Sequence, residues 1–271
     1  MNRCTIRGLT IGDGAPVRVM GVINCSPESF YPGSYTPAHD VLGRACQLVN
    51  EGADIIDVGA RSTAPGAPHI TRKEEIARME QALSSLEGSG IRVSVDTMDP
   101  VVLETCLEYD IAAVNDISGL LDPGYASIVA ESGLPAFLMA SVRAVGDSRN
   151  LGEAFQACAM VETRARAAGV AQYVLDPAIG LWQETRTPDF DLELCRHFSE
   201  FTIYQRPLLL AISRKTFLGR MVGKPPEGRL PASLAMTALL VARGADVVRT
   251  HDVAETRDAI IIAEQVMLAG S

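Results

Sequence analysis

Several short apolar runs in this sequence have the composition of β-strands and end directly in a polar or charged residue. The runs VMGVI, VSV and YVL are followed by Asn24, Asp96 and Asp176, AAV is followed by Asn115, and LLLAIS by Arg214 and then Lys215. Strand interiors this apolar are typical of a parallel sheet that is buried on both faces, where polar side chains are tolerated only at the strand ends. The pattern therefore predicts a parallel sheet whose polar groups gather at one edge.

The predicted strands alternate regularly with predicted helices. Strands are expected at 17–23, 54–58, 91–95, 111–114, 135–139, 172–175, 207–212 and 245–249, and helices near 37–52, 71–88, 100–109, 123–132, 151–168, 189–200, 231–243 and 254–268. A single (β/α)₈ TIM barrel, with its usual length of about 250 residues, suits this pattern better than the alternative of an open doubly wound sheet. We expect one domain over residues 1–271, with active-site loops at 24–36, 59–70 and 213–230.

Composition excludes several classes of function. The 271 residues have a formal net charge of −9, which argues against a nucleic-acid surface. No run approaches the roughly 18 consecutive apolar residues that span a bilayer, and the N-terminal residues have no export signal, so we expect a cytoplasmic protein without membrane contact. The cysteines are scattered without a CxxC pair, which predicts reduced, buried thiols.

Carboxylates and an amide end three of the central strands. In a barrel, Asp96, Asn115 and Asp176 would face one cavity, where they suit a heterocycle that has ring N–H and amino donors. A metal site is the alternative, but no second acid or histidine lies at ligand spacing beside them. For Asp116, in the segment NDISG, we expect an ordinary turn role.

Positive charges follow the last two strands. Lys215 and Arg249 belong to the pair of strands whose loops frequently bind phosphate in barrels of this kind. Arginine supplies a forked donor and lysine a point charge, while His251 is a further donor and Arg214 a neighbouring cation. A class I aldolase, with Lys215 as the Schiff-base amine, is an alternative reading of the same residues.

These segments resemble the signatures of the dihydropteroate synthase family, in the family's order. VMGVINCSPESFYPGS is similar to the signature around NVTPDSF, and GADIIDVGARSTAPG to the signature around GGESTRPG. SVDT, VNDISG, VLDPAIG, AISRKTFLG and VVRTHDV resemble the remaining pterin and phosphate segments. The resemblance covers the chain from about Val17 to Leu268.

The resemblance implies a TIM barrel that joins 6-hydroxymethyl-dihydropterin diphosphate to an arylamine and releases pyrophosphate with Mg²⁺ assistance. It also implies roles for individual residues. Asp96, Asn115 and Asp176 would hold the pterin, and Lys215 would reach its carbonyl group and ring face. Arg249 would cover the ring and, with His251 and Asn24, hold the diphosphate and its Mg²⁺. Ser213 would position the second substrate, and Asp96, Lys215 and Arg249 are the candidate catalytic residues.

The second signature departs from the family pattern. Arg61 and Ala64 stand where the family has Glu and Arg. Two other segments also differ: after Asp176, Trp182 and Gln183 stand where Gly and Lys are common, and residues 140–149 lack the usual Met-His-Met stretch. This wording resembles the branch that makes methanopterin, whose acceptor is a ribofuranosyl-aminobenzene phosphate. We therefore favour that acceptor over p-aminobenzoate, with Arg61 as one of its cations.

Two further alternatives follow from the family resemblance. A related barrel transfers a methyl group from a methyl-tetrahydropterin to a corrinoid protein, and a pterin-binding protein without catalysis is also open. The expected partners are the pterin diphosphate, the arylamine and a second copy of the chain in a homodimer.

Overall fold

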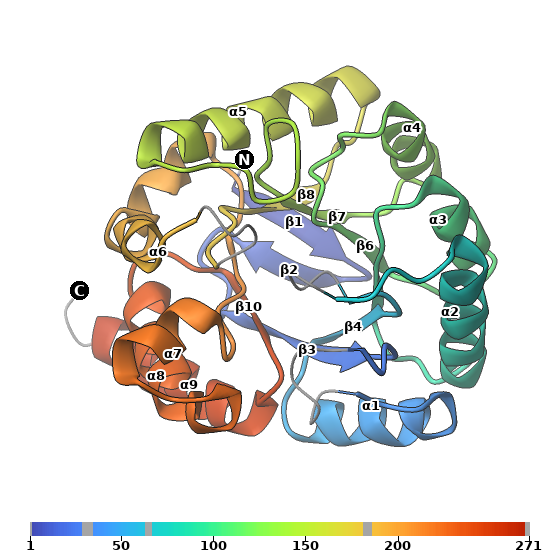
Figure 1. The fold of residues 1–271 in the computed structure, drawn as a ribbon, viewed down its shortest axis with the longest axis horizontal. Helices are drawn as coiled ribbons and strands as arrows, with labels where there is room; N and C mark the ends of the chain where they lie inside the picture. Colours follow the sequence, from blue (N-terminus) through green and yellow to red (C-terminus); the bar gives the residue numbers. More distant parts are fainter. Residues whose placement is uncertain (1, 29–34, 63–66, 181–185, 269–271) are drawn as a thin grey trace.

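The barrel is formed by parallel strands at the centre of the molecule (Figure 1). The computed structural model describes residues 2–28, 35–62, 67–180 and 186–268. Among these residues, eight strands form one sheet in the order β8-β7-β6-β5-β4-β3-β10-β9. A parallel bridge between Leu175 and Leu208 joins the two edge strands and closes the sheet. The strands are β3 (Arg18–Asn24), β4 (Ile55–Gly59), β5 (Val93–Asp96), β6 (Ala113–Asp116), β7 (Ala136–Met139), β8 (Tyr173–Asp176), β9 (Leu209–Leu210) and β10 (Val247–Thr250).

Helices surround this barrel and cover its outer face (Figure 1). They are α1 (Val41–Asn50), α2 (Arg72–Leu86), α3 (Pro100–Cys106), α4 (Pro123–Ser132), α5 (Leu151–Ala168), α6 (Pro188–Arg196), α7 (Thr216–Val222), α8 (Leu230–Val241) and α9 (Val253–Leu268). Short 3₁₀ segments occur at Ala38–Asp40, Phe198–Tyr204 and Pro226–Gly228. The predicted (β/α)₈ TIM barrel is confirmed, because the sheet is parallel and closed rather than open.

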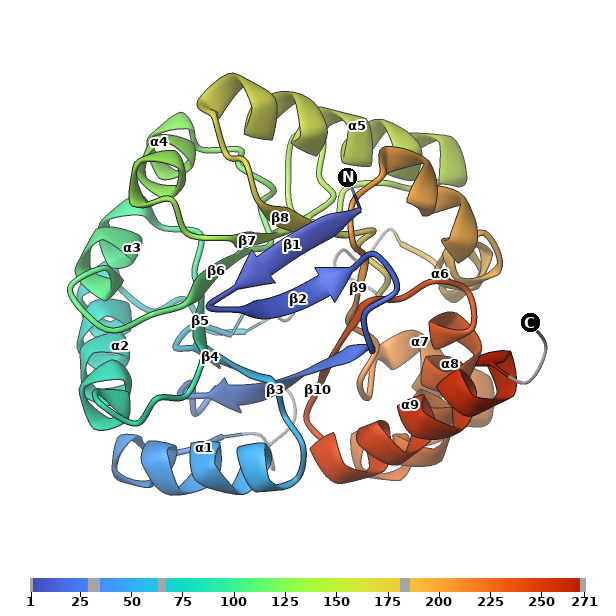
Figure 2. The same ribbon diagram turned by 180° about the vertical axis from the view of Figure 1, so that it is seen from behind.

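An N-terminal hairpin, which the sequence reading did not predict, lies across one end of the barrel (Figure 2). Its strands β1 (Arg3–Ile6) and β2 (Leu9–Gly12) pair antiparallel. Cys4, Ile6, Leu9 and Ile11 form one apolar cluster with residues from the first half of the barrel strands, among them Ile55. The hairpin therefore closes the N-terminal end of the barrel, and the opposite end carries the polar groups.

Helix caps explain where several elements begin. Thr71 and Glu74 form the predicted capping box of α2, and the Asp99 side chain accepts from the Val101 amide at the start of α3. The first α-helix begins later than predicted, because a 3₁₀ turn over Ala38–Asp40, with Pro37 as its N-cap, precedes it. Likewise β9 is shorter than the predicted run 207–212, since the chain leaves the sheet before Arg214, whose φ is 54°.

The cysteines, the segment 213–230 and the helices can be compared with what the sequence predicted. The cysteines are free and all but Cys46 are buried, as predicted. The segment 213–230, expected as a long loop, contains α7 and a 3₁₀ turn. No helix within the described ranges is long and apolar enough to cross a membrane.

Candidate active site

Arg249 connects two carboxylates inside the C-terminal end of the barrel. Its Nε donates to Asp57 Oδ2 and its Nη2 to Asp96 Oδ2, both at 2.7 Å. The Asn115 amide also donates to Asp57 Oδ2, at 2.9 Å. Because β4, β5 and β6 are neighbours in the sheet and in register, side chains from strands far apart in the sequence meet at one place. The structure thus brings together Asp96, Asn115 and Arg249, as the strand-end pattern predicted.

Asp57 is the member of this cluster that the sequence reading missed. It lies within β4, not at its end, and is fully buried. A signal was present in the sequence, since an acid inside the run IIDVG would be costly in a strand without a buried partner. Its Oδ1 atom and the Oγ of Ser94, the register partner of Asp57 on β5, have no hydrogen-bond partner among the described residues. Such buried acceptors suit a ligand that brings N–H donors or an ordered water.

Burial changes the protonation of the two predicted pterin acids. Removal from water raises the pKa of Asp96 to about 7, against the opposing effect of Arg249. Burial also raises the pKa of Asp176 to about 6, although its Oδ1 accepts from the Ala178 amide at 2.7 Å. Both carboxyls would therefore gain from a ligand whose N–H groups stabilise the ionised form.

Lys215 lies against Gly180 in the loop after β8. A Cβ placed on Gly180 would be 2.8 Å from Lys215 Nζ, and the φ of this glycine is 132°. Burial lowers the pKa of Lys215 to about 8, while Asp176 opposes that effect. Asp191 accepts from the Gly180 amide at 2.9 Å and forms a buried ion pair with Arg186 at 3.0 Å. The loop that contains Gly180 and borders Lys215 is thus anchored to α6 through Asp191.

Ser213 and His251 lie side by side at the ends of neighbouring strands. Ser213 Oγ is 3.0 Å from His251 Nδ1 and accepts from the His251 backbone N–H at 3.2 Å. Burial lowers the pKa of His251 to about 4, and the nearby Arg249 acts in the same direction. His251 is therefore neutral near pH 7 and is suited to a hydrogen-bonding role, not to that of an extra positive charge.

Arg214 and Asp116 have structural roles. Arg214 donates to both oxygens of Asp252, at 2.9 and 2.7 Å, and to the carbonyls of Pro226 and Glu227. It ties the segment after β9 to the start of α9. Asp116 accepts from the Ser118 and Leu120 amides at 2.7 Å, which confirms the turn role expected for it.

Arg61 is engaged by α2. Its Nε donates to Glu75 Oε2 at 2.6 Å, and its Nη1 to the Ile70 carbonyl at 3.1 Å. The buried Glu75 carboxylate thus holds the guanidinium that we expected to face an acceptor phosphate. The departures from the family signatures at Ala64, Trp182 and Gln183 lie outside the described residues.

Asn24, at the end of β3, is the expected metal ligand. Its Oδ1 accepts from the Ser26 amide at 2.9 Å, which fixes the orientation of the side chain. No group of three or more His, Cys, Asp or Glu suited to a metal occurs among the described residues. The donor set therefore fits Mg²⁺ in one way, with an amide oxygen from Asn24 and the remaining ligands from phosphate oxygens and water, as is common for this ion.

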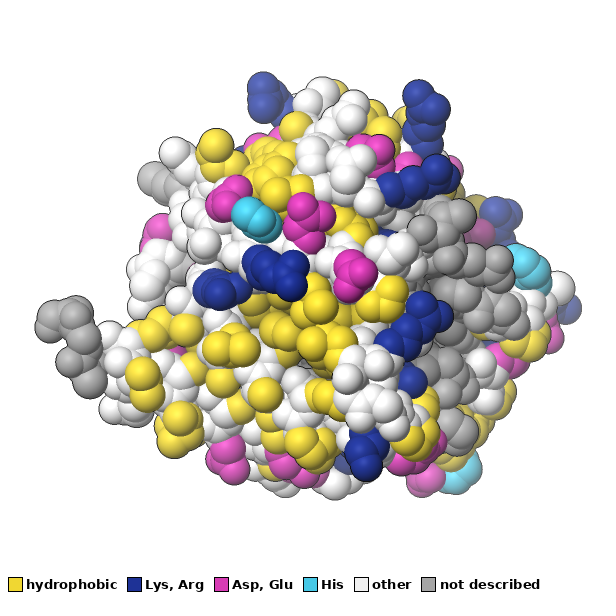
Figure 3. Space-filling model, turned by 60° about the vertical axis from the view of Figure 1, so that its left-hand side comes forward, with side chains coloured by type: hydrophobic (Ala, Val, Ile, Leu, Met, Phe, Trp, Pro, Cys, Tyr) yellow, Lys and Arg dark blue, Asp and Glu magenta, His cyan; other side chains and the backbone are white. Residues whose placement is uncertain are grey.

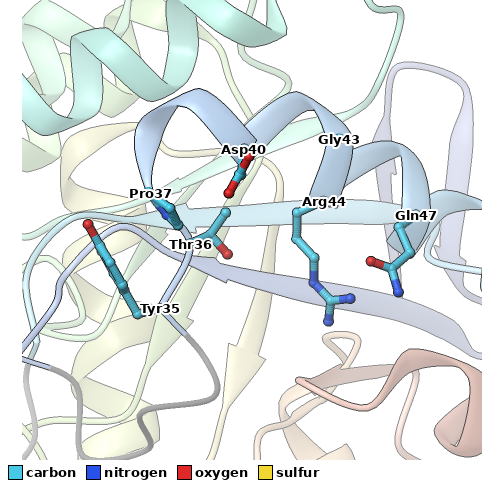
Figure 4. A pocket seen from close by; sticks show the side chains of 7 residues that line it. All are labelled: Tyr35, Thr36, Pro37, Asp40, Gly43, Arg44 and Gln47. Carbon is cyan, nitrogen blue, oxygen red and sulfur yellow. The ribbon is translucent and has the colours of Figure 1, made fainter.

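A separate pocket of about 340 Å³ lies at the N-terminal half of α1. Figure 4 shows Tyr35, Asp40, Arg44 and Gln47 around it. Arg44 Nη2 is 3.5 Å from the carbonyl of His251, so this pocket adjoins the β10 end of the barrel mouth. None of the predicted site residues lines it.

The arrangement has the chemistry of a site for a polar heterocycle with an anionic substituent. Asp57, Asn115 and Asp176 offer buried acceptors and Asp96 a half-buried one, while Lys215 and Arg249 supply positive charge at the same end of the barrel. The set suits displacement of an anionic leaving group, with charge stabilised by fixed groups.

Known proteins share both the sequence and the fold. Residues 20–251 match the family of pterin-binding enzymes. A dihydropteroate synthase of Mycobacterium leprae is 34% identical over 275 residues, with 94% of this chain and 95% of that protein covered. The type-3 dihydropteroate synthase of Escherichia coli is 32% identical over 264 residues, with 91% and 98% covered.

Two solved structures give the same result for the fold. The crystal structure of Yersinia pestis dihydropteroate synthase with a sulfonamide drug has a TM-score of 0.88 and 30% identity, covering 98% of this chain and 99% of that one. The Xanthomonas albilineans dihydropteroate synthase with 4-aminobenzoic acid has a TM-score of 0.87 and 28% identity, covering 98% of both chains.

Proposed function

Because the chain belongs to the dihydropteroate synthase family of pterin-binding enzymes, transferases that form a C–N bond, we propose that it joins 6-hydroxymethyl-7,8-dihydropterin diphosphate to p-aminobenzoate. The observation that supports this most directly is the cluster in which Arg249 bridges Asp57 and Asp96 at the mouth of the barrel. A pterin offers ring N–H and amino donors to these acids, and its diphosphate offers negative charge to the cations beside them.

The pterin would lie among Asp96, Asn115 and Asp176, with Asp57 below it. Its N–H groups would donate to the two carboxylates whose pKa burial has raised, so binding would favour their ionised form. Lys215, whose pKa is about 8, would remain largely protonated near pH 7 and would reach the ring carbonyl. Ionised acids close to the ring would also stabilise positive charge on the pterin methylene as the leaving group departs.

The diphosphate would bind at the ends of β3 and β10. Arg249, whose Nε and Nη2 donate to Asp57 and Asp96, offers its positive charge and its remaining N–H groups. Neutral His251 offers a single N–H, and Asn24 an amide oxygen for Mg²⁺. When bound, Mg²⁺ would supply Lewis-acid stabilisation of the charge on the departing pyrophosphate. The bond between the methylene carbon and the diphosphate oxygen breaks with its electrons on the oxygen. The amine nitrogen forms the new C–N bond and loses a proton.

The acceptor we propose is p-aminobenzoate, and the methanopterin acceptor favoured from the sequence has no support. That preference came from a resemblance in the wording of several segments, and Arg61, the cation expected for that acceptor, is paired with Glu75. The Xanthomonas albilineans relative was solved with 4-aminobenzoic acid. Ser213, hydrogen-bonded to His251, remains the residue expected to help position the acceptor.

The other enzyme classes fit less well. An aldolase would use Lys215 as a Schiff-base amine, and the low pKa of this lysine suits that chemistry. However, the relatives are dihydropteroate synthases, and an aldolase has no use for the acid and amide cluster. The methyl-transfer alternative needs no diphosphate site, whereas Lys215 and Arg249 lie where a diphosphate could bind.

The test is a pyrophosphate-release assay with the pterin diphosphate, Mg²⁺ and a panel of arylamines. We expect turnover with p-aminobenzoate, and its loss in Asp96→Ala and Asp176→Ala, with both variants remaining folded. Turnover only with the ribofuranosyl-aminobenzene phosphate would restore the methanopterin acceptor. Pterin binding without pyrophosphate release on any amine would leave a binding protein without catalysis.

A homodimer remains part of the proposal. Apolar side chains are exposed on α7, α8 and α9, including Met221, Leu239, Ile262 and Val266, which are 51%, 58%, 65% and 70% exposed. Figure 3 shows hydrophobic side chains gathered over this face. A contiguous apolar face of this kind marks an interaction surface. Sedimentation analysis of the purified protein and of Leu239→Glu tests it. The cytoplasmic location likewise remains a prediction.

A further inference from the structure

A continuous series of hydrogen bonds runs from Asn24 into the first βα loop. The Ser26 amide donates to Asn24 Oδ1 at 2.9 Å, and the Ser26 hydroxyl donates to Glu28 Oε2 at 2.6 Å. Ser26 is fully buried, so these bonds are shielded from exchange with water. The orientation of Asn24 is therefore linked to the position of the Glu28 carboxylate.

Arg78 of α2 holds that carboxylate with both ends of its fork. Its Nη1 and Nη2 donate to Glu28 Oε2 and Oε1, at 3.0 and 2.8 Å. The same Nη1 donates to the Ala60 carbonyl of the second βα loop, at 3.2 Å. Hydrogen bonding to Arg78, followed by that to Ser26, lowers the pKa of Glu28 to about 2, so the pair stays charged at any working pH. One side chain thus fixes the stems of two loops.

This contact differs from an ordinary surface ion pair, which contributes about 0–1 kcal/mol. The contact is bidentate, and the side chains of Arg78 and Glu28 are only 23% and 21% exposed. Arg78 makes a third hydrogen bond, from Nη1 to the backbone carbonyl of Ala60. Helix α2 makes a similar link one turn earlier, where Glu75 joins Arg61 of the second loop to Thr97 after β5. The N-terminal half of α2 is therefore a common anchor for the loops at the barrel mouth.

We propose that Arg78 is a positioning residue for the diphosphate, which acts through Glu28 and Ser26 to hold Asn24 in place. This inference rests on the proposed function, because it assumes that Asn24 meets the diphosphate and its Mg²⁺. The pterin ring, in contrast, binds to side chains on β5, β6 and β8 that Arg78 does not touch. Loss of Arg78 should consequently weaken recognition of the diphosphate and spare that of the ring.

The experiment compares two ligands by calorimetry: 6-hydroxymethyl-dihydropterin without phosphates, and its diphosphate with Mg²⁺. For Arg78→Ala, we expect at least a tenfold loss of affinity for the diphosphate and less than a twofold change for the unphosphorylated pterin. Arg72→Ala is the matched control, because Arg72 is also on α2 but pairs at 2.6 Å with Asp99, which follows β5, and not with a residue of the first loop. It should change neither affinity.

Glu28→Gln separates positioning from simple charge. If Arg78 acted only by neutralising Glu28 near the diphosphate, removal of the carboxylate charge would strengthen diphosphate binding. If the ion pair positions Asn24, Glu28→Gln weakens diphosphate binding, and the double variant loses no more than Arg78→Ala alone, since both break one contact. Arg78→Lys should be intermediate, because lysine cannot reproduce the fork.

Equal losses for both ligands, or no loss with the diphosphate, would overturn the proposal. Should Arg78→Ala not fold, Glu28→Gln gives the same comparison with an almost isosteric side chain. Failure of the proposed function has a different signature: the wild-type protein would bind the diphosphate without releasing pyrophosphate on any arylamine, and the ratio of the two affinities could still be measured.

Discussion

Ile55 and Asp57 lie two residues apart on β4 and on the same side of the strand, yet their surroundings differ completely. Ile55 belongs to the apolar cluster that the N-terminal hairpin closes. Asp57 accepts from Arg249 and Asn115. One end of the barrel interior is thus built for stability and the other for binding, and only about two residues of strand separate them.

The largest effect should follow from a cavity at the closed end. Ile55→Ala removes a fully buried side chain, which should lower the free energy of unfolding by about 2–5 kcal/mol. Urea denaturation measures this loss. Affinity of the folded protein for pterin should be unchanged, and a drop in affinity without a drop in stability would show that the two ends are not separate.

At the open end, Arg249→Ala should weaken binding of the pterin diphosphate by about 1.5–3 kcal/mol, the range for hydrogen bonds to charged groups. The unphosphorylated pterin should lose less, since the guanidinium would contact only its ring. Calorimetry with the two ligands checks this. An equal loss for both would mean that Arg249 does not contact the diphosphate.

Asp96→Asn should abolish pterin binding and remove the fall in stability that ionisation of Asp96 causes between about pH 4 and pH 7. The folded-state pKa of Asp96, about 7, lies above its unfolded value. The folded protein therefore binds more protons between about pH 4 and pH 7, and the wild-type protein loses stability as the pH rises through that window. Denaturation of both proteins from pH 4 to pH 8 tests this, and a difference that does not depend on pH would contradict it.

The smallest effect should come from Lys215. With a pKa of about 8 in the ligand-free protein, this lysine is half deprotonated at that pH. The ratio of the affinity for the diphosphate to that for the unphosphorylated pterin should fall about twofold between pH 7 and pH 8, because only the protonated amine attracts the anion, whereas ionisation of Asp96 affects both ligands. Lys215→Met should bind more weakly and lack this slope. The same slope in the variant would place the titrating group elsewhere.

Residues at strand ends were the most predictable part of the site. Asp96, Asn115 and Arg249 meet as expected, because the closure of parallel strands brings their carboxyl ends to one edge. The apolar runs and the regular alternation of strands and helices can be read from neighbouring residues alone. They therefore predicted the barrel strands to within a few residues.

What the sequence could not show depends on contacts between distant residues. Asp57 was missed because a lone acid within a strand gives no sign of its partner, which lies 192 positions away on β10. The reading of Arg61 as an acceptor cation overlooked Glu75, to which it turns instead. The hairpin was missed because β1 and β2 are only four residues each. Their apolar residues pack against side chains at the N-terminal end of the barrel, and that surface exists only once the strands have closed into a barrel.

The backbone at Gly180 gives a criterion for reading other sequences. Any larger residue there would place its first side-chain carbon 2.8 Å from the Lys215 amine and would need a φ of 132°, which other residues rarely adopt. A relative that keeps the lysine but replaces this glycine would have to move one or the other. We expect relatives with such a replacement to have the barrel but not the catalytic activity. The residue at this position would then help to distinguish active enzymes from inactive relatives, although it is not itself catalytic.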